Sequence, residues 1–350
     1  MSFKLKTPKF SFKKAVEIKI VPTKKKLNTI IESRRPIIFR GYVNDWPIMK
    51  YNKSMGAILE YLQCHSKKKN NHAVAIGSNK INNEMGLTEQ MKVNHIYKTW
   101  NFNKFKTELI NKNSIDTNKL LYLQASSIKS NFPKLYTQLN QKFAHYSINP
   151  KIWIGDGQLT PIHSDSEHNF TCCVCGIKRF IIFPPQEIGN LYLSPIDKNP
   201  AGTPVSTINT LNYNLSTHPK FELALKKAIM AELYPGDVLF LPAGWYHEVQ
   251  SEGFNTMINY WWKDISAAEF ANAKEAFNIS MASIKNLPKE YRDYWKIWFD
   301  HYVFQINGDP YEHIQQRHQG VYGKSTPYRK KKLKILIDKI FAKRLFPGSF

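Results

Sequence analysis

The sequence predicts a mainly β protein with flanking helices, in which a double-stranded β-helix of the jelly-roll type carries a C-terminal helical extension. Between Leu121 and Trp262, short apolar and β-branched runs alternate with turns rich in Gly, Pro and Asn, as in sheets of many short strands. After Lys263 the apolar residues recur at helical spacing. The 350 residues are 42% hydrophobic and 13% aromatic, enough for one large core and a smaller appended unit.

Three segments follow from these patterns. Residues 1–30 form a basic N-terminal lead-in, residues 31–265 the β-rich domain, and residues 266–350 the C-terminal helical extension. Within the first part of the domain, residues 31–120 mix helix and strand, with a polar loop at residues 66–71 and a helix at residues 100–111.

The central part predicts a hairpin followed by an insert. The runs at residues 170–174 and 178–183 flank Gly176, and Pro184 and Pro185 end the second run, which is the pattern of a hairpin. Residues 184–231 form a long insert with a helix at residues 221–231. Such an insert either shapes access to a site or covers a sheet edge.

The last segment predicts three helices. Ser266 with Glu269 gives a capping box for a helix at residues 267–285. The next helix carries an aromatic stripe, which is typical of a core or an interface: Trp295, Trp298, Phe299 and Tyr302. The terminal basic helix has one apolar face, which docks on protein or lies on a membrane: Leu333, Leu336, Ile337, Ile340 and Phe341.

A His-x-Asp pair and a distant His are the candidate metal ligands. Side chains alternate along a strand, so His163 and Asp165 project to the same side. His247 follows a short apolar run broken by Pro242 and Gly244, a strand end and a turn. Two His and one carboxylate are the ligands of non-haem Fe(II) oxygenases, which keep positions open for co-substrate and oxygen. Because a lone H-x-D is common by chance, the pattern needs further support.

Lys178 supplies that support. An ammonium beside Phe180 and Ile182 on an apolar strand needs an anionic partner, and the predicted hairpin contains no acidic residue. A ligand carboxylate is therefore one candidate partner. The alternative is a lysine at the hairpin end that reaches water.

These motifs together resemble the JmjC-type, cupin-fold 2-oxoglutarate oxygenases, and within them the group typified by the hypoxia-inducible factor asparaginyl hydroxylase. The likeness covers about residues 30–265. The matching positions are Pro36 to Gly41, Asp45 to Pro47, Thr160, Pro161, His163, Asp165, Asn169, Phe170, Gly176, Lys178, Arg179, Ile181, Phe183 to Pro185, Pro235 to Asp237, Trp245, His247 and Asn259 to Trp261.

The resemblance implies a role for each site residue and a set of cofactors. It implies Fe(II) bound by His163, Asp165 and His247, with 2-oxoglutarate as co-substrate and O2 as oxidant. Lys178 pairs with the distal carboxylate of 2-oxoglutarate, and Thr160 and Tyr122 donate hydroxyls to that end. The amides of Asn169 and Asn259 lie near its other end and the metal.

Two details refine the expected reaction. Asp165, together with a Lys fifteen positions after His163, resembles the hydroxylase branch more than the demethylases. Glu248 stands where the nearest relatives have a second His, which leaves the metal ligands intact but changes their surroundings.

The expected function is therefore a cytoplasmic Fe(II)- and 2-oxoglutarate-dependent hydroxylase acting on a C–H bond. A protein side chain is the first candidate substrate, an RNA or tRNA nucleoside the second and a small metabolite the third. A non-catalytic cupin module that binds acidic partners is the alternative from another class. The C-terminal helices of the resembled hydroxylase imply a homodimer.

Charge and cysteines set the remaining expectations. The net charge of +23, with lysines clustered at residues 24–26, 67–69 and 329–332, favours an acidic partner such as RNA, or else reflects the codon bias of an AT-rich genome. No apolar run is long enough to span a membrane, and the N-terminus has no continuous apolar stretch. Cys64 stands alone, and the cluster of Cys172, Cys173 and Cys175 fits small core residues better than a soft-metal site, with Cys173 and Cys175 expected in the barrel interior.

Overall fold

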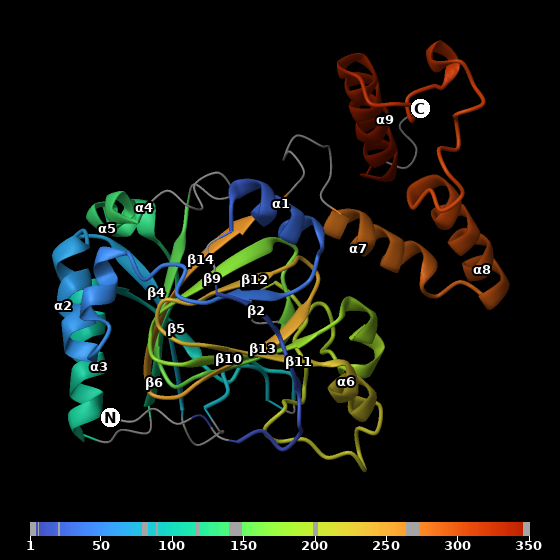
Figure 1. Cartoon of the computed structure of the whole chain (residues 1–350). Helices are drawn as coiled ribbons and strands as arrows, with labels where there is room; N and C mark the ends of the chain where they lie inside the picture. The colour runs from blue at the N-terminus through green and yellow to red at the C-terminus, as the bar shows by residue number, and fades with distance from the viewer. Residues whose placement is uncertain are drawn as a thin grey trace. The chain divides into compact units, whose positions relative to one another are not determined.

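The computed structural model describes residues 5, 7–19, 22–78, 83–88, 90–115, 119–139, 149–198, 202–263 and 273–345. The chain divides into two compact units, residues 1–264 and 265–350, which are described separately. Figure 1 shows the strands confined to the first unit. Among the described helices, none is both long and apolar enough to cross a membrane.

The first unit is built on strands that are mostly short. They are β1 (Lys13–Lys14), β2 (Val16–Ile18), β3 (Ile37–Phe39), β4 (Asn71–Ser78), β5 (Ile96–Asn101), β6 (Lys119–Ser127), β7 (Lys151–Asp156), β8 (Leu159–Ser164), β9 (His168–Cys175), β10 (Lys178–Phe183), β11 (Ile229–Leu233), β12 (Val238–Leu241), β13 (Tyr246–Ser251) and β14 (Phe254–Trp262).

These strands form two sheets that enclose a common interior. One sheet has the order β1-β11-β10-β13-β8, and the other has the order β2-β3-β12-β9-β14-β7-β6-β4-β5. A core cluster with members from both sheets, including Phe180, Leu239, Val249 and Met257, fills part of the space between them. The chain passes repeatedly from one sheet to the other, so the predicted jelly-roll core is confirmed.

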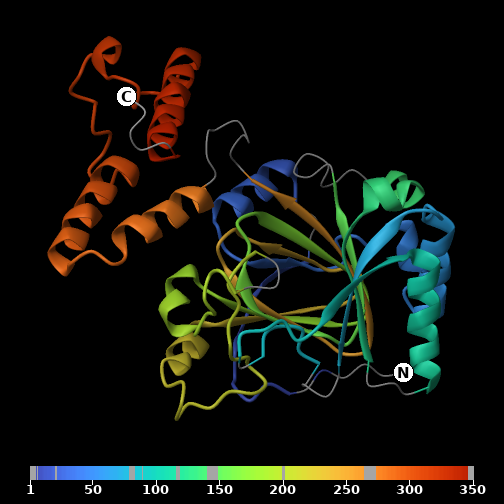
Figure 2. The same cartoon turned by 180° about the vertical axis from the view of Figure 1, so that it is seen from behind.

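Helices cover the outer faces of the two sheets. They are α1 (Lys24–Glu32), α2 (Met55–His65), α3 (Phe102–Ile115), α4 (Ile128–Asn131), α5 (Pro133–Gln138) and α6 (Phe221–Lys227), with the short helices η1 (Pro47–Tyr51) and η4 (Pro185–Asn190). Helices α2, α3 and α5 share one cluster with the nine-stranded sheet, whereas α6 packs on β10 of the five-stranded sheet. Figure 2 shows these two helical layers on opposite sides of the strands.

The predicted hairpin at Gly176 is wrong in its pairing. Strand β9 pairs with β12 and β14, whereas β10 pairs with β11 and β13 in the other sheet. Gly176, at φ +77°, therefore turns the chain between sheets. The local pattern could not reveal this because both strands are buried on both faces, so neither carries an alternation that identifies its partner.

Two further predictions need correction. The helix predicted at residues 221–231 ends at Lys227, and Ile229 begins strand β11. The basic segment predicted as a lead-in contributes β1, β2 and α1, and its first two strands pair with β11 and β3. Its described part is thus integral to the first unit.

The second unit is helical, as predicted. It contains α7 (Ala273–Ile284), α8 (Lys289–Trp298), η5 (Phe299–Val303), η6 (Gln316–His318) and α9 (Pro327–Leu345). The predicted cap formed by Ser266 and Glu269 lies outside the described residues, as do the side chains of Ile340 and Phe341. No described residue of α7 or α8 is buried.

Candidate active site

Three candidate ligands meet between neighbouring strands. His163 on β8 and His247 on β13 are paired directly across the two strands, with ring centroids 4.3 Å apart. Asp165 follows the last residue of β8, and its carboxylate completes a cluster whose ligand atoms lie within 4.8 Å of one another. Three residues from distant parts of the sequence are therefore placed by strand pairing to hold one metal ion.

The backbone fixes the tautomer of both imidazoles. Nδ1 of His163 donates to the carbonyl of Pro161 at 2.8 Å, and Nδ1 of His247 donates to the carbonyl of Trp245 at 3.1 Å. A carbonyl oxygen only accepts, so each Nδ1 carries a hydrogen, and in the neutral imidazole the lone pair is then on Nε2. Orienting a metal-binding His through its second nitrogen is the usual arrangement of such sites.

Burial keeps His247 neutral. Loss of solvent, and then the nearby His163, lower the pKa of His247 to about 4, and the charge of Asp165 opposes this only in part. A neutral imidazole is the form that binds a metal. On the third ligand, Trp261 donates its indole Nε1 hydrogen to Oδ2 of Asp165 at 3.2 Å, which holds the carboxylate. Two imidazoles and one carboxylate are a ligand set that fits Fe(II).

Lys178 is fully buried on the inner face of β10. Its ammonium donates to Oγ of Ser251 at 3.0 Å, and within the described chain it forms no ion pair with a carboxylate. Burial lowers the pKa of Lys178 to about 8. The alternative of a lysine reaching water is wrong, because its side chain is inaccessible.

Strand register places Lys178 on the same interior face as the candidate ligands. Across β10, β13 and β8, one row contains Ile182, His247 and His163, and the next contains Phe180, Val249 and Thr160. Lys178 and Ser251 form the third row. An elongated dianion lying along these rows would reach from the metal to the ammonium.

Tyr122 and Thr160 are also brought together. The Tyr122 hydroxyl is hydrogen bonded to Thr160 and Gln158, and burial raises the pKa of Tyr122 far above its usual range. The phenol therefore stays protonated and can donate to a ligand. Thr160 and His163 have opposite parity on β8, yet both face inward because the register shifts between His247 and Val249.

The two amides predicted near the metal contact each other. Nδ2 of Asn259 donates to Oδ1 of Asn169 and to Oγ1 of Thr171, both at 2.9 Å. Oδ1 of Asn259 is buried and has no partner among the described residues. This acceptor is available to a bound group.

Aromatic side chains link Tyr122 with Trp261, which holds Asp165. Trp153 on β7 lies 5.5 Å from Tyr122 and 5.9 Å from Trp261, measured between ring centroids. Its indole Nε1 is buried without an acceptor in the described chain. The sequence reasoning assigned no role to Trp153, Gln158, Thr171 or Ser251. Ser251 was detectable, since it lies four residues after His247 and thus on the same strand face.

Cys173 and Cys175 do not share a face, contrary to expectation. Cys173 belongs to the interior cluster, whereas Cys175 belongs to the outer core under the helices and donates to the carbonyl of Asn52 at 3.2 Å. A register shift between Thr256 and Met257 on β14, opposite these cysteines, breaks the alternation.

Glu248 points away from the candidate ligands. It is fully buried on the outer face of the five-stranded sheet, where its carboxylate accepts from N and Oγ1 of Thr210 at 2.8 and 2.5 Å. The insert at residues 184–231 also forms a backbone hydrogen bond with the edge strand β8, in which N of Ser206 donates to the carbonyl of Ile162 at 2.8 Å. Of the two uses predicted for the insert, covering a sheet edge is therefore confirmed.

Comparison with known proteins agrees with this fold and geometry. Residues 22–268 match the model of the cupin-like domain. The chain belongs to the cupin-like, JmjC-type family. Members of this family are generally Fe(II)- and 2-oxoglutarate-dependent oxygenases.

Several curated proteins are similar to part of the chain. The lysine-specific demethylase JMJ31 of Arabidopsis thaliana is 34% identical over 32% of this chain and 20% of its own length. The tRNA wybutosine-synthesizing protein 5 of Gallus gallus is 31% identical over 38% of this chain and 43% of its own length. JmjC domain-containing protein D of Dictyostelium discoideum is 30% identical over 62% of this chain and 49% of its own length. The chain thus spans less than half of each of these relatives.

Proposed function

We propose that the protein is an Fe(II)- and 2-oxoglutarate-dependent dioxygenase that hydroxylates a C–H bond. The observation that carries this proposal is the common interior face of the His163, Asp165 and His247 cluster and of buried Lys178. A binding module for acidic partners would not need an oriented ligand set or an inaccessible ammonium, whose burial is costly without an anion.

Each residue then has a defined task. His163, Asp165 and His247 would hold iron through two Nε2 atoms and one carboxylate. Lys178, Thr160 and Tyr122 would bind the distal carboxylate of 2-oxoglutarate, and Asn169 and Asn259 would contact the end nearer the metal. When bound, iron and 2-oxoglutarate supply the oxidising chemistry, in which O2 and 2-oxoglutarate give succinate, CO2 and one oxygen atom for the substrate C–H bond.

A protein side chain is the first candidate substrate. This choice rests on the likeness to the hydroxylase branch, in which Asp rather than Glu is the carboxylate ligand. A small metabolite ranks third, because no described residue near the ligands marks a particular small molecule.

A nucleoside of RNA is the second candidate, and one observation favours it. The indole of Trp245 donates to the carbonyl of Arg34 at 3.1 Å, and Arg34 also contacts His168, so the end of α1 borders the candidate site. Arg34 and the adjoining Arg35 make this border basic, which suits a phosphate backbone. One relative is named for wybutosine synthesis in tRNA.

Succinate formation tests the reaction and sorts the substrates. Purified protein with Fe(II), ascorbate and 2-oxoglutarate should form more succinate when cell extract is added. Extract treated with protease should lose this stimulation if the substrate is a protein, and extract treated with ribonuclease should lose it if the substrate is RNA. No succinate in any mixture would support the binding module instead.

A further inference from the structure

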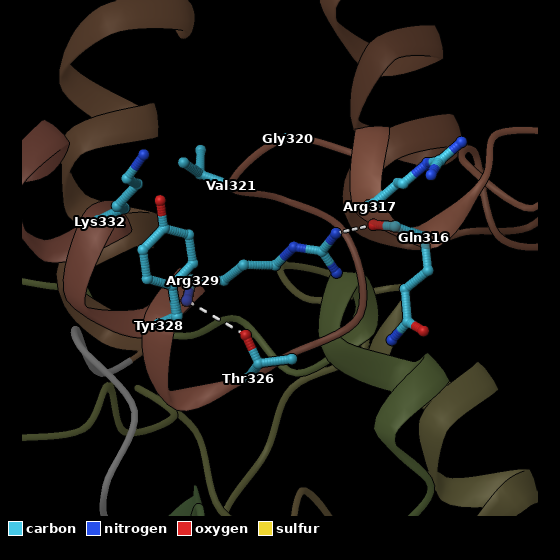
Figure 3. Close-up of a pocket in the computed structure, with 8 residues that line it drawn as sticks. All are labelled: Gln316, Arg317, Gly320, Val321, Thr326, Tyr328, Arg329 and Lys332. Carbon is cyan, nitrogen blue, oxygen red and sulfur yellow. Dashed lines mark hydrogen bonds between the residues drawn. The ribbon is translucent and has the colours of Figure 1, made fainter.

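The C-terminal unit contains a basic pocket that the proposed reaction does not use. It has a volume of about 540 Å³ and lies between the loop after η6 and the first turns of α9 (Figure 3). Its lining residues are Gln316, Arg317, Gly320, Val321, Thr326, Tyr328, Arg329 and Lys332.

Arg329 gives the pocket its shape. Its guanidinium donates to the carbonyl of Lys324 at 2.9 Å and to the carbonyl of Gln316, so one side chain ties together both ends of the loop. Its backbone N donates to Oγ1 of Thr326 at 3.2 Å, which fixes the start of α9. Figure 3 shows the guanidinium crossing the pocket toward Gln316. Arg329 is therefore structural, and other cations must bind a ligand.

The sequence around the pocket contains many more basic than acidic residues. Residues 315–345 contain ten Lys and Arg but one Asp. The side chains of Arg317, Lys324 and Lys332 are exposed, and in the described part of the chain none of them pairs with a carboxylate. On α8, by contrast, Lys289 and Lys296 each pair with an Asp one turn later. Such a surplus of cations over carboxylates favours a polyanionic ligand.

Aromatic side chains among these cations narrow the choice of polyanion. Tyr328 is 65% exposed and Tyr322 is 60% exposed, and Nζ of Lys332 lies 4.8 Å from the ring centroid of Tyr328. Open aromatic faces beside basic residues are the means by which proteins bind single-stranded nucleic acids, since bases stack on the rings while cations follow the phosphates. An acidic protein would need only the cations.

A lipid surface fits this face less well. Leu333, Leu336 and Ile337, the apolar face predicted for the terminal helix, are half-buried within the unit. A helix that lies on a bilayer must instead keep its apolar face open for insertion.

We propose that this pocket binds a single-stranded segment of nucleic acid, with Arg317, Lys332 and the adjoining exposed Lys331 on phosphates and Tyr328 stacked on a base. The proposal does not depend on the reaction at the candidate iron site, because binding is measured without iron or 2-oxoglutarate.

Fluorescence anisotropy with labelled oligouridine RNA of about 15 nucleotides tests the proposal on the full-length protein. The pocket variant is Arg317→Gln with Lys331→Gln and Lys332→Gln. A matched control removes three exposed charges in the first unit, through Lys67→Gln, Lys68→Gln and Lys69→Gln. The pocket variant should bind roughly tenfold more weakly, and its log affinity should fall less steeply with log salt, by about 2, because each lost phosphate contact contributes about 0.7. The control should retain both properties.

A second variant separates stacking from charge. Tyr328→Leu should weaken binding roughly tenfold with an unchanged salt slope, since stacking releases no counterions. Equal losses in the two triple variants would overturn the proposal, because they would reflect the general positive field. Unchanged affinity in Tyr328→Leu, or displacement of RNA by polyglutamate at equal charge, would also overturn it and would indicate an acidic protein as the partner.

Discussion

Of the three candidate iron ligands, Asp165 is the one whose removal should weaken metal binding with the least effect on the fold. It supplies the only carboxylate of the described cluster, and its side chain is only half-buried, so removing it leaves little empty volume. Asp165→Ala should abolish Fe(II)-dependent turnover of 2-oxoglutarate while the thermal unfolding transition is retained. Equilibrium binding of Fe(II) under anaerobic conditions checks the assignment. A variant that binds Fe(II) as tightly as the unaltered protein would show that the ligand assignment is wrong.

Lys178 should determine the affinity for 2-oxoglutarate without affecting the metal. A charge-assisted bond of this kind contributes about 1.5–3 kcal/mol, so Lys178→Ala should weaken 2-oxoglutarate binding by roughly one to two decades. Ser251→Ala is the matched control, because it removes the hydrogen-bond partner of Lys178 but keeps the charge. Calorimetric titration of the metal-loaded protein measures both variants. Equal affinity in Lys178→Ala and the unaltered protein would remove Lys178 from the co-substrate pocket.

The lowered pKa of Lys178 also predicts a pH dependence. Burial lowers this pKa to about 8 from an ordinary 10.5, so the ammonium is present below pH 8 and lost above it. A carboxylate binds the ammonium, so affinity for 2-oxoglutarate should be constant below about pH 8 and fall up to tenfold per pH unit above it. Lys178→Ala should lack this dependence. A flat profile for the unaltered protein between about pH 7 and 9.5 would contradict the prediction.

The lowered pKa of Lys178 also makes the stability of the fold depend on pH, in the opposite direction to the affinity for 2-oxoglutarate. A base whose folded pKa is lowered destabilises the fold while it is charged, so the penalty from Lys178 is present below about pH 8 and is relieved as the pH rises toward 10.5. The free protein should therefore gain stability in the range where it loses affinity for 2-oxoglutarate.

Strand parity explains which site residues the sequence could predict. His163 with Asp165, and Asn259 with Trp261, are two residues apart and share a face. Register shifts opposite His247 and Met257 break this rule, so Thr160 faces inward against parity and Cys175 faces outward. A bulge depends on the partner strand, and the sequence of one strand does not report it.

At the scale of elements, the turn between β9 and β10 should tolerate no side chain at Gly176 without a loss of stability. A Cβ at this position would lie 2.6 Å from the carbonyl oxygen of Phe254, and φ is +77°. Gly176→Ala should lower the free energy of unfolding by about 1–3 kcal/mol because both the backbone and the contact are strained. Gly56→Ala in α2 is the control, since nothing lies within 4 Å of its Cβ and alanine favours a helix. Denaturant unfolding that ranks the two variants the other way would contradict this account.

The elements differ in how far their sequence predicts them. Helix α3 lies near its predicted range of residues 100–111, and α8 contains Trp295 and Trp298 of the predicted aromatic stripe, because helical patterns are local. The sequence predicts helix as far as Ala231 because Phe221 to Ala231 continues one apolar pattern, whereas pairing with β10 makes the end of this segment the strand β11. The sheet to which β10 belongs is likewise decided by contacts far along the chain.

At the scale of the whole molecule, the C-terminal unit exposes an apolar face that a second copy of the chain would cover. Phe277 is 47% exposed and Trp295 is 37% exposed, and both line a groove of about 440 Å³ between α7 and α8 whose lining is largely apolar. Patches of this kind mark interfaces, and two-fold dimers are the commonest way to bury them.

We therefore predict a homodimer that forms through α7 and α8. Light scattering at micromolar concentration should give twice the 40.8 kDa of the chain. Phe277→Glu places a charge on the predicted interface and should give a monomer. Ile188→Glu alters a comparably exposed apolar residue, 56% accessible on η4 of the first unit, and should leave the dimer intact. A monomeric mass for the unaltered protein would rule out the dimer, and dissociation by both variants would place the interface elsewhere, because of these two residues only Phe277 lies on the groove between α7 and α8.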